Sequence, residues 1–451
     1  MLRKVLVANR GAVAARVIRT LKRMGIRSVA VYSEADRDLP YVSAADESYC
    51  LGDSPPRLSY LNQPGVMDVL ARSNADAVHP GYGFLAESAD FAHAVEAHGA
   101  CFIGPSPHWI EAMGHKTRAR DLLASHGMPM PQASRVWDVP WQSLCPEARR
   151  DITDVGFPLL VKPADGGGGI GMQIARSVEE LPAAWDRSRS IAARSFATAQ
   201  VFAERLVEQP RHIEFQVLAD RYGQIRILHE RDCSVQRRYQ KVIEEAPAPN
   251  IDRGDLDRMA GRIAEILGGI GYDVIGTVEM LYDPVRRAFH FLELNTRLQV
   301  EHAVTEEITG VDIVAAQVQL AAGESIATVL PNELRRTGHA IEARIYAEDP
   351  KRFFPSSGDL TTYQLPAGDG IRVETGYRQG NTVSTYYDPM LAKVIAHGHD
   401  RQQAIGRLVA TLCRTQIIGV KTNLPLLLEV LRAPAFIAGC ASTQLVSQLR
   451  D

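Results

Sequence analysis

Two carboxylates and an amide fall on neighbouring segments that have the composition of strands. Glu279 lies within 276–282, and Glu293 and Asn295 lie two residues apart within 289–295, across an expected hairpin. Because side chains two apart in a strand share a face, the three can converge on one sheet face. Carboxylate and amide oxygens suit Mg²⁺ better than zinc. The alternative is a solvated strand face, but Glu293 sits in an otherwise apolar strand, where a lone charge is costly.

A second polar run, at 297–302, follows this hairpin directly. If the run is extended, Arg297, Gln299 and Glu301 share one face and place a cation, an amide and a carboxylate in a row. Such a row would bind a small anion and supply a base; a surface ion pair is the alternative. The basic cluster at 236–241 is too short for a nucleic-acid surface and better fits an anionic ligand.

A glycine run separates two further strand-like segments, 157–162 and 172–176. No helix follows the glycines at 166–169, whereas Walker A and Rossmann loops both open a helix. The pattern predicts a hairpin lid whose backbone N–H groups close over phosphates. Lys162, just ahead of the glycines, would contribute an ammonium to the same phosphates. A plain mobile loop would have the same composition.

Composition excludes several classes of protein. The chain has 451 residues, 50 basic and 53 acidic side chains and a net charge of -3, so charge gives no argument for nucleic acid or an anionic membrane as partner. No apolar run approaches the roughly 18 residues of a membrane-spanning helix. The 6 cysteines are scattered without a CxxC pair, which argues against a zinc site or disulfide framework and favours a reducing, cytoplasmic location.

Strand and helix patterns alternate over the first third of the chain. The expected strands are 4–8, 28–33, 75–79 and 100–104, and the expected helices are 12–24, about 60–73 and 89–98. This alternation predicts a doubly wound parallel sheet. A GxGxxG fingerprint is missing after the first strand, so a nicotinamide or flavin site is not expected. The segment 79–84 follows a strand end, where such sheets bind ligands, although an ordinary Pro/Gly turn is equally favoured.

The pattern changes beyond this first unit. Periodicity weakens and prolines accumulate over 115–155, which indicates a hinge into a smaller unit, and from about 204 the chain becomes strand-rich. Residues 212–219 alternate strictly, with His212, Glu214 and Gln216 on the polar face. His212 would equally suit an exposed strand histidine.

These motifs resemble those of the ATP-grasp enzymes and, within them, of the biotin carboxylase family. FPLLVKPADGGGGIG at 157–171 and FLELNTRL at 291–298 resemble the two ATP-grasp signatures. The stretches similar to biotin carboxylases are ANRG at 8–11, HPGYGFLAE at 79–87, MGHK at 113–116, RDCSVQRR at 231–238, QKVIEEAPAP at 240–249, NTRLQVEH at 295–302, GHAIEARIYAEDP at 338–350 and YYDPMLAKVI at 386–395. The similarity runs in order from Met1 to about Asn423.

The resemblance implies a site for ATP and a divalent cation. The positions that match ATP contacts are Lys116, Lys162, Gly167, Gly168, Gly169, Glu204, Val207, His212, Gln236, Tyr239 and Leu281. Within this set the lysines, His212 and Gln236 correspond to contacts with phosphates or ribose. Glu204 and Val207 fall on the segment that presents backbone groups to adenine, and Leu281 lies under the base. The positions that match ligands of Mg²⁺ (or Mn²⁺) are Glu279, Glu293 and Asn295.

It also implies the chemistry of bicarbonate and biotin. Lys241, Arg297, Gln299 and Val300 match the bicarbonate pocket. Glu301 resembles the base that deprotonates bicarbonate for attack on the γ-phosphate. The carboxyphosphate then breaks down to CO₂ and phosphate, and phosphate takes the proton from biotin N1.

Two positions match contacts with biotin itself. Arg344 resembles the residue that stabilises the biotin enolate, and Tyr82 lies where the biotin ring is expected. A guanidinium suits the first role because it stays charged at any relevant pH.

The implied fold is an ATP-grasp fold, α/β and α+β, with a doubly wound N-terminal domain. Its expected parts are an N-terminal domain at 1–114, a linker at 115–134, a lid at 135–205, an ATP-grasp core at 206–330 and a C-terminal domain at 331–451. A Met-Lys-Met biotin attachment site is missing, so we expect biotin on a separate biotin carboxyl carrier protein. Carboxyltransferase subunits would complete a complex such as the acetyl-CoA carboxylase of fatty acid biosynthesis.

Several residues depart from the family pattern. Asp165 replaces a small residue and Ile170 replaces a basic one, which shifts the lid by about two charge units towards negative. At an effective dielectric near 20, one unit charge at about 4 Å is worth about 4 kcal/mol, so ATP affinity would fall. Ile170 resembles the urea-carboxylase branch. Tyr239 stands where His is frequent, and nothing in the sequence explains Ala12 and Ala303 in place of Glu and Pro.

The expected homodimer surface also departs from the family pattern. Arg19 and Arg372 are kept, but Arg23 replaces a Glu and Asp369 replaces a Phe. A pair between Arg23 and Asp369 across the two-fold axis would compensate for the lost acid.

Two alternatives to a biotin carboxylase subunit remain. A different ATP-grasp ligase would activate another carboxylate, but Arg297, Glu301 and Arg344 argue against it. A non-catalytic or weakly active nucleotide-binding subunit would explain Asp165, Ile170 and Tyr239.

Overall fold

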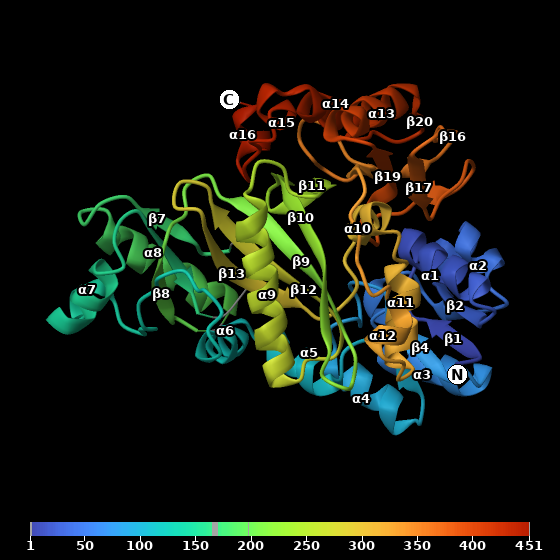
Figure 1. Cartoon of the computed structure of the whole chain (residues 1–451), viewed down its shortest axis with the longest axis horizontal. Helices are drawn as coiled ribbons and strands as arrows, with labels where there is room; N and C mark the ends of the chain where they lie inside the picture. Colours follow the sequence, from blue (N-terminus) through green and yellow to red (C-terminus); the bar gives the residue numbers. More distant parts are fainter. Residues whose placement is uncertain (1, 165–169, 197, 451) are drawn as a thin grey trace.

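The computed structural model describes residues 2–164, 170–196 and 198–450, leaving out the side chain of Lys116. In Figure 1 an N-terminal α/β unit lies at the right, a smaller unit projects to the left, and a central sheet lies between them. The C-terminal helices cover the top of this sheet in that view. None of the described helices combines the length and apolar composition needed to cross a bilayer.

The N-terminal unit is a parallel sheet in the order β3-β2-β1-β4-β5. Its strands are β1 (Lys4–Val7), β2 (Arg27–Ser33), β3 (Glu47–Gly52), β4 (Ala77–His79) and β5 (Cys101–Phe102). Its helices are α1 (Gly11–Arg23), α2 (Pro40–Ala44), α3 (Gln63–Ser73) and α4 (Ala89–Ala97), followed by α5 (Pro107–Gly114) and α6 (Lys116–Ser125). The doubly wound prediction is confirmed. The edge strand β3 was not predicted, because its partly exposed sequence ESYCLG has no continuous apolar run.

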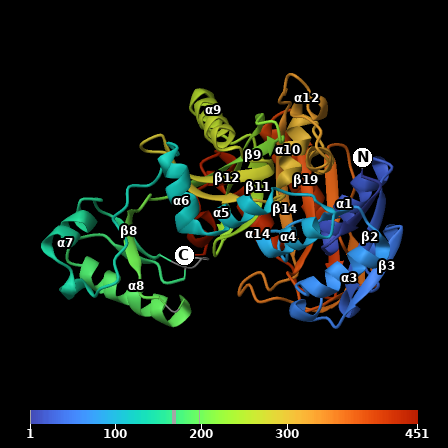
Figure 2. The same cartoon turned by 90° about the horizontal axis from the view of Figure 1, so that it is seen from below.

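The projecting unit is built on a small antiparallel sheet in the order β7-β6-β8. Its elements are β6 (Leu159–Pro163), β7 (Gln173–Ala175), β8 (Val201–Arg205), α7 (Pro146–Thr153) and α8 (Leu181–Phe196). Figure 2 shows this unit standing apart from the remainder of the chain. The strands expected at 157–162 and 172–176 are present with shorter bounds, whereas Asp165 and the glycines at 166–169 lie outside the described residues.

The central sheet is antiparallel, in the order β13-β12-β9-β10-β11-β14-β19-β17. Its strands are β9 (Arg211–Ala219), β10 (Ile225–Arg237), β11 (Gln240–Ala246), β12 (Val274–Asp283), β13 (Ala288–Asn295), β14 (His339–Tyr346), β17 (Ile371–Thr375) and β19 (Met390–Gly398). The sheet continues without interruption across residue 330, where the expected core ends and the expected C-terminal domain begins.

Helices and short strand pairs surround this sheet. The helices are α9 (Arg253–Ile270), α10 (His302–Thr309), α11 (Ile313–Ala321), α12 (Ile326–Val329), α13 (Arg401–Arg414), α14 (Leu424–Arg432), α15 (Pro434–Ile437) and α16 (Leu445–Gln448). The strand pairs are β15 (Gly358–Asp359) with β18 (Thr382–Val383) and β16 (Thr362–Gln364) with β20 (Gln416–Ile418).

Strand register aligns charged residues on one face of the central sheet. Glu293 lies opposite Glu279, Glu279 opposite Glu214, and Glu214 opposite Arg231. Phe215, which lies between the polar positions of β9, packs into an apolar core on the other face. The alternation predicted for 212–219 therefore separates a charged face from an apolar core, although both faces of β9 are buried.

The run 297–301 differs from the extended segment expected from the sequence. The chain leaves β13 at Asn295, bends, and enters α10 with Glu301 at the N-cap. The turn between β10 and β11 is also unusual, because Arg238 and Tyr239 adopt left-handed φ values of 49° and 67°. A two-residue hairpin turn of this kind requires positive φ at both positions, whatever the residue type.

The projecting unit has its own apolar core, so a cavity there should destabilise it locally. Trp185 is fully buried in α8, and its Nε1 donates to the carbonyl of Val139 at 3.1 Å. Trp185→Ala should destabilise this unit by about 3–5 kcal/mol. Hydrogen exchange should therefore accelerate in peptides from α8 more than in peptides from β9. Val178→Ala, at a side chain that is 53% exposed, is the control. Equal acceleration in both peptides would contradict a separate core.

Candidate active site

The ammonium of Lys241 is the centre of a buried cluster. Its Nζ donates to Glu214 Oε2 at 2.6 Å, to Glu279 Oε1 at 2.8 Å and to Glu301 Oε1 at 2.6 Å. Strands β11, β9 and β12 and the start of α10 each contribute one of these side chains. Burial alone would lower the pKa of Lys241, but the carboxylates, Glu214 foremost, raise it well above its usual value.

Glu301 is held as a carboxylate between two cations. Its second oxygen, Oε2, accepts from Arg344 at 2.8 Å. Burial opposes ionisation, yet the charges of Lys241, Arg344 and Arg231 keep the pKa of Glu301 well below its usual value. A carboxylate that is ionised, desolvated and next to an anion-binding cation has the properties of a general base.

Arg344 connects this carboxylate to a second acidic group. Its Nε lies 2.7 Å from Glu244 Oε1, on the neighbouring strand β11. Tyr82 is close enough for the Arg344 charge to oppose the burial that raises the pKa of the Tyr82 hydroxyl. The main chain at Tyr82 is held by Asn9, whose Nδ2 donates to the Tyr82 carbonyl at 2.8 Å. The structure therefore brings together Arg344, Glu301 and Tyr82, which the sequence placed far apart.

Side chains that carry possible ligands for a hard cation lie around Glu279. Its Oε1 accepts from Asn295 Nδ2 at 2.9 Å and from Gln299 Nε2 at 3.2 Å, while the amide oxygen of Asn295 accepts from Arg297. Glu293 lies opposite Glu279 in the register of β13. The predicted ligands Glu279, Glu293 and Asn295 thus come from facing strands, and their oxygen donors fit Mg²⁺.

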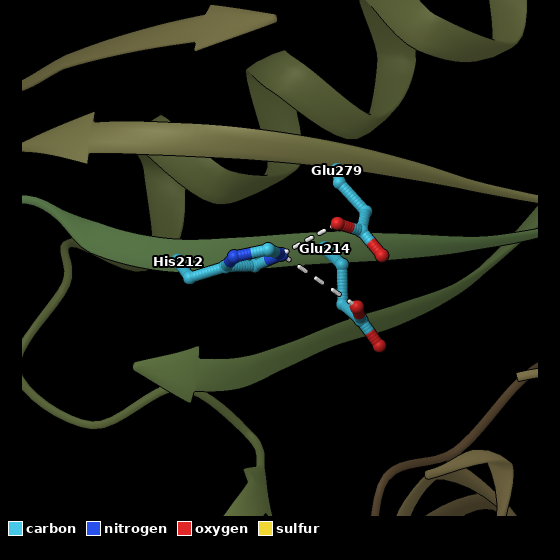
Figure 3. A group of neighbouring side chains, drawn as sticks. All are labelled: His212, Glu214 and Glu279. Atoms are coloured by element: carbon cyan, nitrogen blue, oxygen red, sulfur yellow. Dashed lines mark ion pairs between the residues drawn. The ribbon is translucent and has the colours of Figure 1, made fainter. Parts of the chain in front are cut away.

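Glu214 was missed as a member of this cluster. Figure 3 shows the His212 ring pointing toward the carboxylate of Glu214, on the same strand, and that of Glu279, on the neighbouring strand β12. His212 Nε2 lies 2.9 Å from Glu279 Oε2 and 4.0 Å from Glu214 Oε2. These residues form a possible ligand group, and a second one contains Glu214, Cys233 and Glu301. The alternation of β9 placed Glu214 beside His212, but no sequence feature indicated its partners on β11 and β12.

The expected row of Arg297, Gln299 and Glu301 on one strand face is not present, because the backbone bends after Asn295. Arg297 and Gln299 contact each other directly, whereas Glu301 is linked to Gln299 through Lys241 and Glu279. Arg297 donates to Gln299 Oε1 at 3.0 Å and to Asn295 Oδ1 at 2.9 Å. Its Nε also donates to Glu87 Oε2 at 2.8 Å, which ties this segment to the N-terminal unit.

The predicted nucleotide contacts lie partly in the described residues. Lys162 and Arg120 both form ion pairs with Glu204, which hold the pKa of that buried carboxyl below its usual value. Gln236 Nε2 lies 2.9 Å from His212 Nδ1.

The remaining predicted contacts are more dispersed. Val207 is buried and Leu281 half-buried, opposite His212 in register, whereas Tyr239 is 71% exposed. The side chain of Lys116 and the residues Gly167, Gly168 and Gly169 lie outside the described part of the chain.

A second buried carboxylate pair lies beside Arg344. Glu244 on β11 and Glu342 on β14 are opposite each other in register, and both are fully buried. Burial raises the pKa of Glu244 to about 8, with repulsion from Glu342 added and Arg344 opposing. Burial also raises the pKa of Glu342 to about 7, with repulsion from Glu374 added and Lys393 and Arg344 opposing. The sequence gave no indication of this pair, because its members are far apart along the chain.

Family models cover most of the chain. The matching models are described as the biotin carboxylase N-terminal domain over residues 1–110, the carbamoyl-phosphate synthase L chain ATP-binding domain over 115–329, and the biotin carboxylase C-terminal domain over 342–448.

Curated proteins match the chain over nearly its whole length. Biotin carboxylase 2 of Bacillus subtilis is 45% identical over 451 residues, which cover 99% of this chain and 100% of that protein. The biotin carboxylase of Allochromatium vinosum is 44% identical over 100% of this chain and 99% of that protein. The mitochondrial methylcrotonoyl-CoA carboxylase subunit alpha of Glycine max is 42% identical over 99% of this chain, but only 61% of that subunit is covered.

Solved structures agree with these matches. The biotin carboxylase domain dimer of Hydrogenobacter thermophilus 2-oxoglutarate carboxylase, in complex with MgADP, ADP and bicarbonate, superposes with a TM-score of 0.91 at 40% identity. The match covers 100% of this chain and 99% of that chain. The biotin carboxylase of Campylobacter jejuni in a β-γ-ATP complex gives a TM-score of 0.91 at 37% identity, with 99% of each chain covered.

The buried pair should make the stability of the protein depend on pH. A carboxyl whose pKa is higher in the folded protein than in the unfolded chain binds a proton on folding, so its contribution to stability falls as pH rises. Glu342→Gln removes this titration between the unfolded value of about 4.3 and the folded value of about 7. The loss of stability between pH 6 and pH 8 should then shrink by about 1 kcal/mol.

Thermal unfolding at the two pH values measures this difference. The midpoint of the wild type should fall more from pH 6 to pH 8 than that of Glu342→Gln. Glu333→Gln, at a side chain that is 72% exposed, is the matched control and should behave like the wild type. An identical fall in all three proteins would show that Glu342 does not hold a proton in this range.

Proposed function

The chain belongs to the biotin carboxylase family of ATP-dependent ligases, and we propose that it carboxylates biotin presented by a separate carrier protein, with ATP and bicarbonate as co-substrates. The observation that carries the proposal is Glu301, an ionised and buried carboxylate between Lys241 and Arg344. This position combines a base with the cations needed for an anionic substrate and for an enolate.

The base strength of Glu301 would depend on substrate binding. Without substrate, Lys241 and Arg344 lower its pKa, which makes it a weak base. Bicarbonate bound by Lys241, Arg297 and Gln299 would take over part of the charge of Lys241. The pKa of Glu301 would then rise, and the carboxylate would accept the bicarbonate proton as the bicarbonate oxygen attacks the γ-phosphate of ATP.

Phosphoryl transfer requires charge neutralisation and alignment more than covalent help. Lys162 would turn from Glu204 toward the ATP phosphates, and Arg297 would hold the attacking bicarbonate. Mg²⁺ held by Glu279, Glu293 and Asn295 would supply the remaining positive charge. Because carboxyphosphate hydrolyses readily, closure of the unit at 135–205 over the site would exclude water.

Arg344 would serve the biotin half of the reaction. Carboxyphosphate breaks at its P–O–C linkage to give CO₂ and phosphate, the phosphate takes the N1 proton of biotin, and N1 forms the new bond to CO₂. The enolate that develops on the biotin oxygen needs a cation that does not titrate, and Arg344 keeps its charge because Glu244 and Glu301 raise its pKa further. Tyr82 would lie against the biotin ring.

The proposed partners are a biotin carboxyl carrier protein and carboxyltransferase subunits. The match with this chain covers 98% to 100% of the length of three proteins named biotin carboxylase. This similarity to single-activity subunits supports a biotin carrier on a separate protein. Acetyl-CoA, another acyl-CoA and a urea-like molecule were the expected acceptors. Alpha subunits of methylcrotonoyl-CoA carboxylase match almost as well as the biotin carboxylases, which supports an acyl-CoA acceptor without favouring acetyl-CoA.

A homodimer is proposed on similar grounds, since one structural relative is described as a dimer. Within the chain, Arg23 lies 2.5 Å from Asp312, and Asp369 lies 2.6 Å from Arg407. A pair between Arg23 and Asp369 across the dimer axis would therefore have to replace these contacts.

The proposal is tested by ADP release from purified protein with MgATP. ADP release should require bicarbonate and should increase when free biotin is added. Glu301→Gln should reduce the bicarbonate-dependent rate by at least 100-fold, the lower end of general-base contributions, because an amide cannot accept the proton. ATP binding, measured by calorimetry, should be retained.

Glu333→Gln makes the same chemical change at the surface and should leave the rate unchanged. ADP release without bicarbonate dependence, or no stimulation by biotin, would contradict the proposed function. ATP binding without any turnover would favour a non-catalytic nucleotide-binding subunit, to which Ile170 and Tyr239 point.

A further inference from the structure

A second buried lysine lies behind the polar segment 296–301, where the proposed mechanism does not use it. Lys393, on β19, is 1% exposed. Its Nζ lies 3.0 Å from Glu374 Oε2 and 3.4 Å from Glu342 Oε2, and it donates a hydrogen bond to the carbonyl of Val300. A buried ammonium is costly, so its contacts require a physical reason.

The carbonyl of Val300 belongs to the peptide unit that leads into Glu301. The preceding carbonyl, at Gln299, accepts from His302 Nδ1 at 2.7 Å. Burial lowers the pKa of His302 well below its usual value, so the neutral ring carries its proton on Nδ1 as this hydrogen bond requires. Consecutive carbonyls on either side of Val300 are therefore held by buried donors from β19 and α10.

These two contacts hold the conformation of a segment that belongs to no helix or strand. Residues 296–301 lie between β13 and α10, outside both elements. In a planar peptide unit the N–H points opposite to the C=O, so fixing the carbonyls of Gln299 and Val300 also fixes the N–H groups of Val300 and Glu301. Those N–H groups point away from the two buried donors. The side chains of Gln299 and Glu301 meanwhile contact Glu279 and Lys241.

The need to neutralise Glu374 does not explain why a lysine is buried at position 393. Glu374 Oε1 already lies 3.2 Å from Arg16 and 3.2 Å from Arg19, and it accepts from Arg372. With these guanidiniums present, an apolar side chain at 393 would leave Glu374 paired. Among the described residues Lys393 provides two contacts that no other side chain provides: an ion pair with Glu342 at 3.4 Å and the hydrogen bond to the carbonyl of Val300. The second of these reaches the segment 296–301, and a Glu342 variant separates it from the first.

We propose that Lys393 is a positioning residue that holds the segment 296–301 in its bicarbonate-binding conformation before bicarbonate arrives. The inference rests on the proposed function and adds a residue to it. A site arranged in advance does not spend binding energy on ordering the backbone, so bicarbonate affinity should depend on Lys393. ATP affinity should depend on it little, because the proposed ATP contacts Lys162 and Gln236 lie on β6 and β10.

The test compares bicarbonate and ATP dependence of ADP release in three variants. Lys393→Met/Glu342→Gln removes the ammonium together with the carboxyl group that it alone pairs, and Glu374 keeps its three guanidinium partners. Glu342→Gln alone is the matched control, since it changes a contact of Lys393 without touching Val300. Lys393→Arg keeps the charge but moves the donor. Circular dichroism and thermal unfolding establish that each variant is folded.

The KM for bicarbonate should rise at least 10-fold in the double variant, and a smaller rise is expected in Lys393→Arg. It should stay within 2-fold of the wild type in Glu342→Gln. The KM for ATP should change less than 2-fold in all three variants. If the double variant does not fold, Lys393→Arg against Glu342→Gln decides the question on the same two constants.

The proposal is overturned if the folded Lys393 variants have the same bicarbonate KM as Glu342→Gln, or if the KM values for bicarbonate and ATP rise together. Failure of the proposed function would give a different experimental result. In that case the wild type itself would release no ADP in response to bicarbonate, and the positioning role would be overturned together with the function. Failure of the positioning role alone leaves the bicarbonate response of the wild type intact.

Discussion

The interaction on which the site depends is the sharing of one buried ammonium, that of Lys241, among Glu214, Glu279 and Glu301. A buried charge persists only where partners satisfy it, and here β9, β12 and the start of α10 each bring one partner to β11. The register of the central sheet is therefore determined by charge as well as by apolar packing. A shift of β9 by one residue would turn Glu214 into the apolar core.

The same interaction explains why the cluster is stable without substrate yet suited to chemistry. Each cation that would contact a substrate is already paired with a neighbouring carboxylate. Lys162 pairs with Glu204, Arg297 with Glu87 and Arg344 with Glu301. An anionic substrate would replace the carboxylate partner of each of these cations. Because the cations are already removed from water, substrate binding would cost little additional desolvation of the protein.

Sequence patterns predicted the features of the fold that are determined within a single segment of the chain. The alternation of β9 and the strands of the N-terminal sheet were predicted, because polar and apolar residues alternate in β9 and the N-terminal strands are short apolar runs. The edge strand β3 and the bend after Asn295 were missed, because β3 is partly exposed and has no continuous apolar run, and the bend is imposed by side-chain contacts. Glu214, Glu342 and Lys393 find their partners across strands that are far apart in the chain. The roles assigned to Lys241 and Arg344 came from family resemblance rather than from any local pattern.

The central sheet has a consequence for how such a chain can be divided. Strands β14, β19 and β17, from the last third of the sequence, continue directly from β11, and Arg344 reaches Glu301 across that junction. The stretch after residue 330 thus supplies three of the eight strands of a shared sheet and is not a separate domain. Gene fusion or domain exchange that cut there would split one folding unit, whereas the projecting unit has a hydrophobic core of its own.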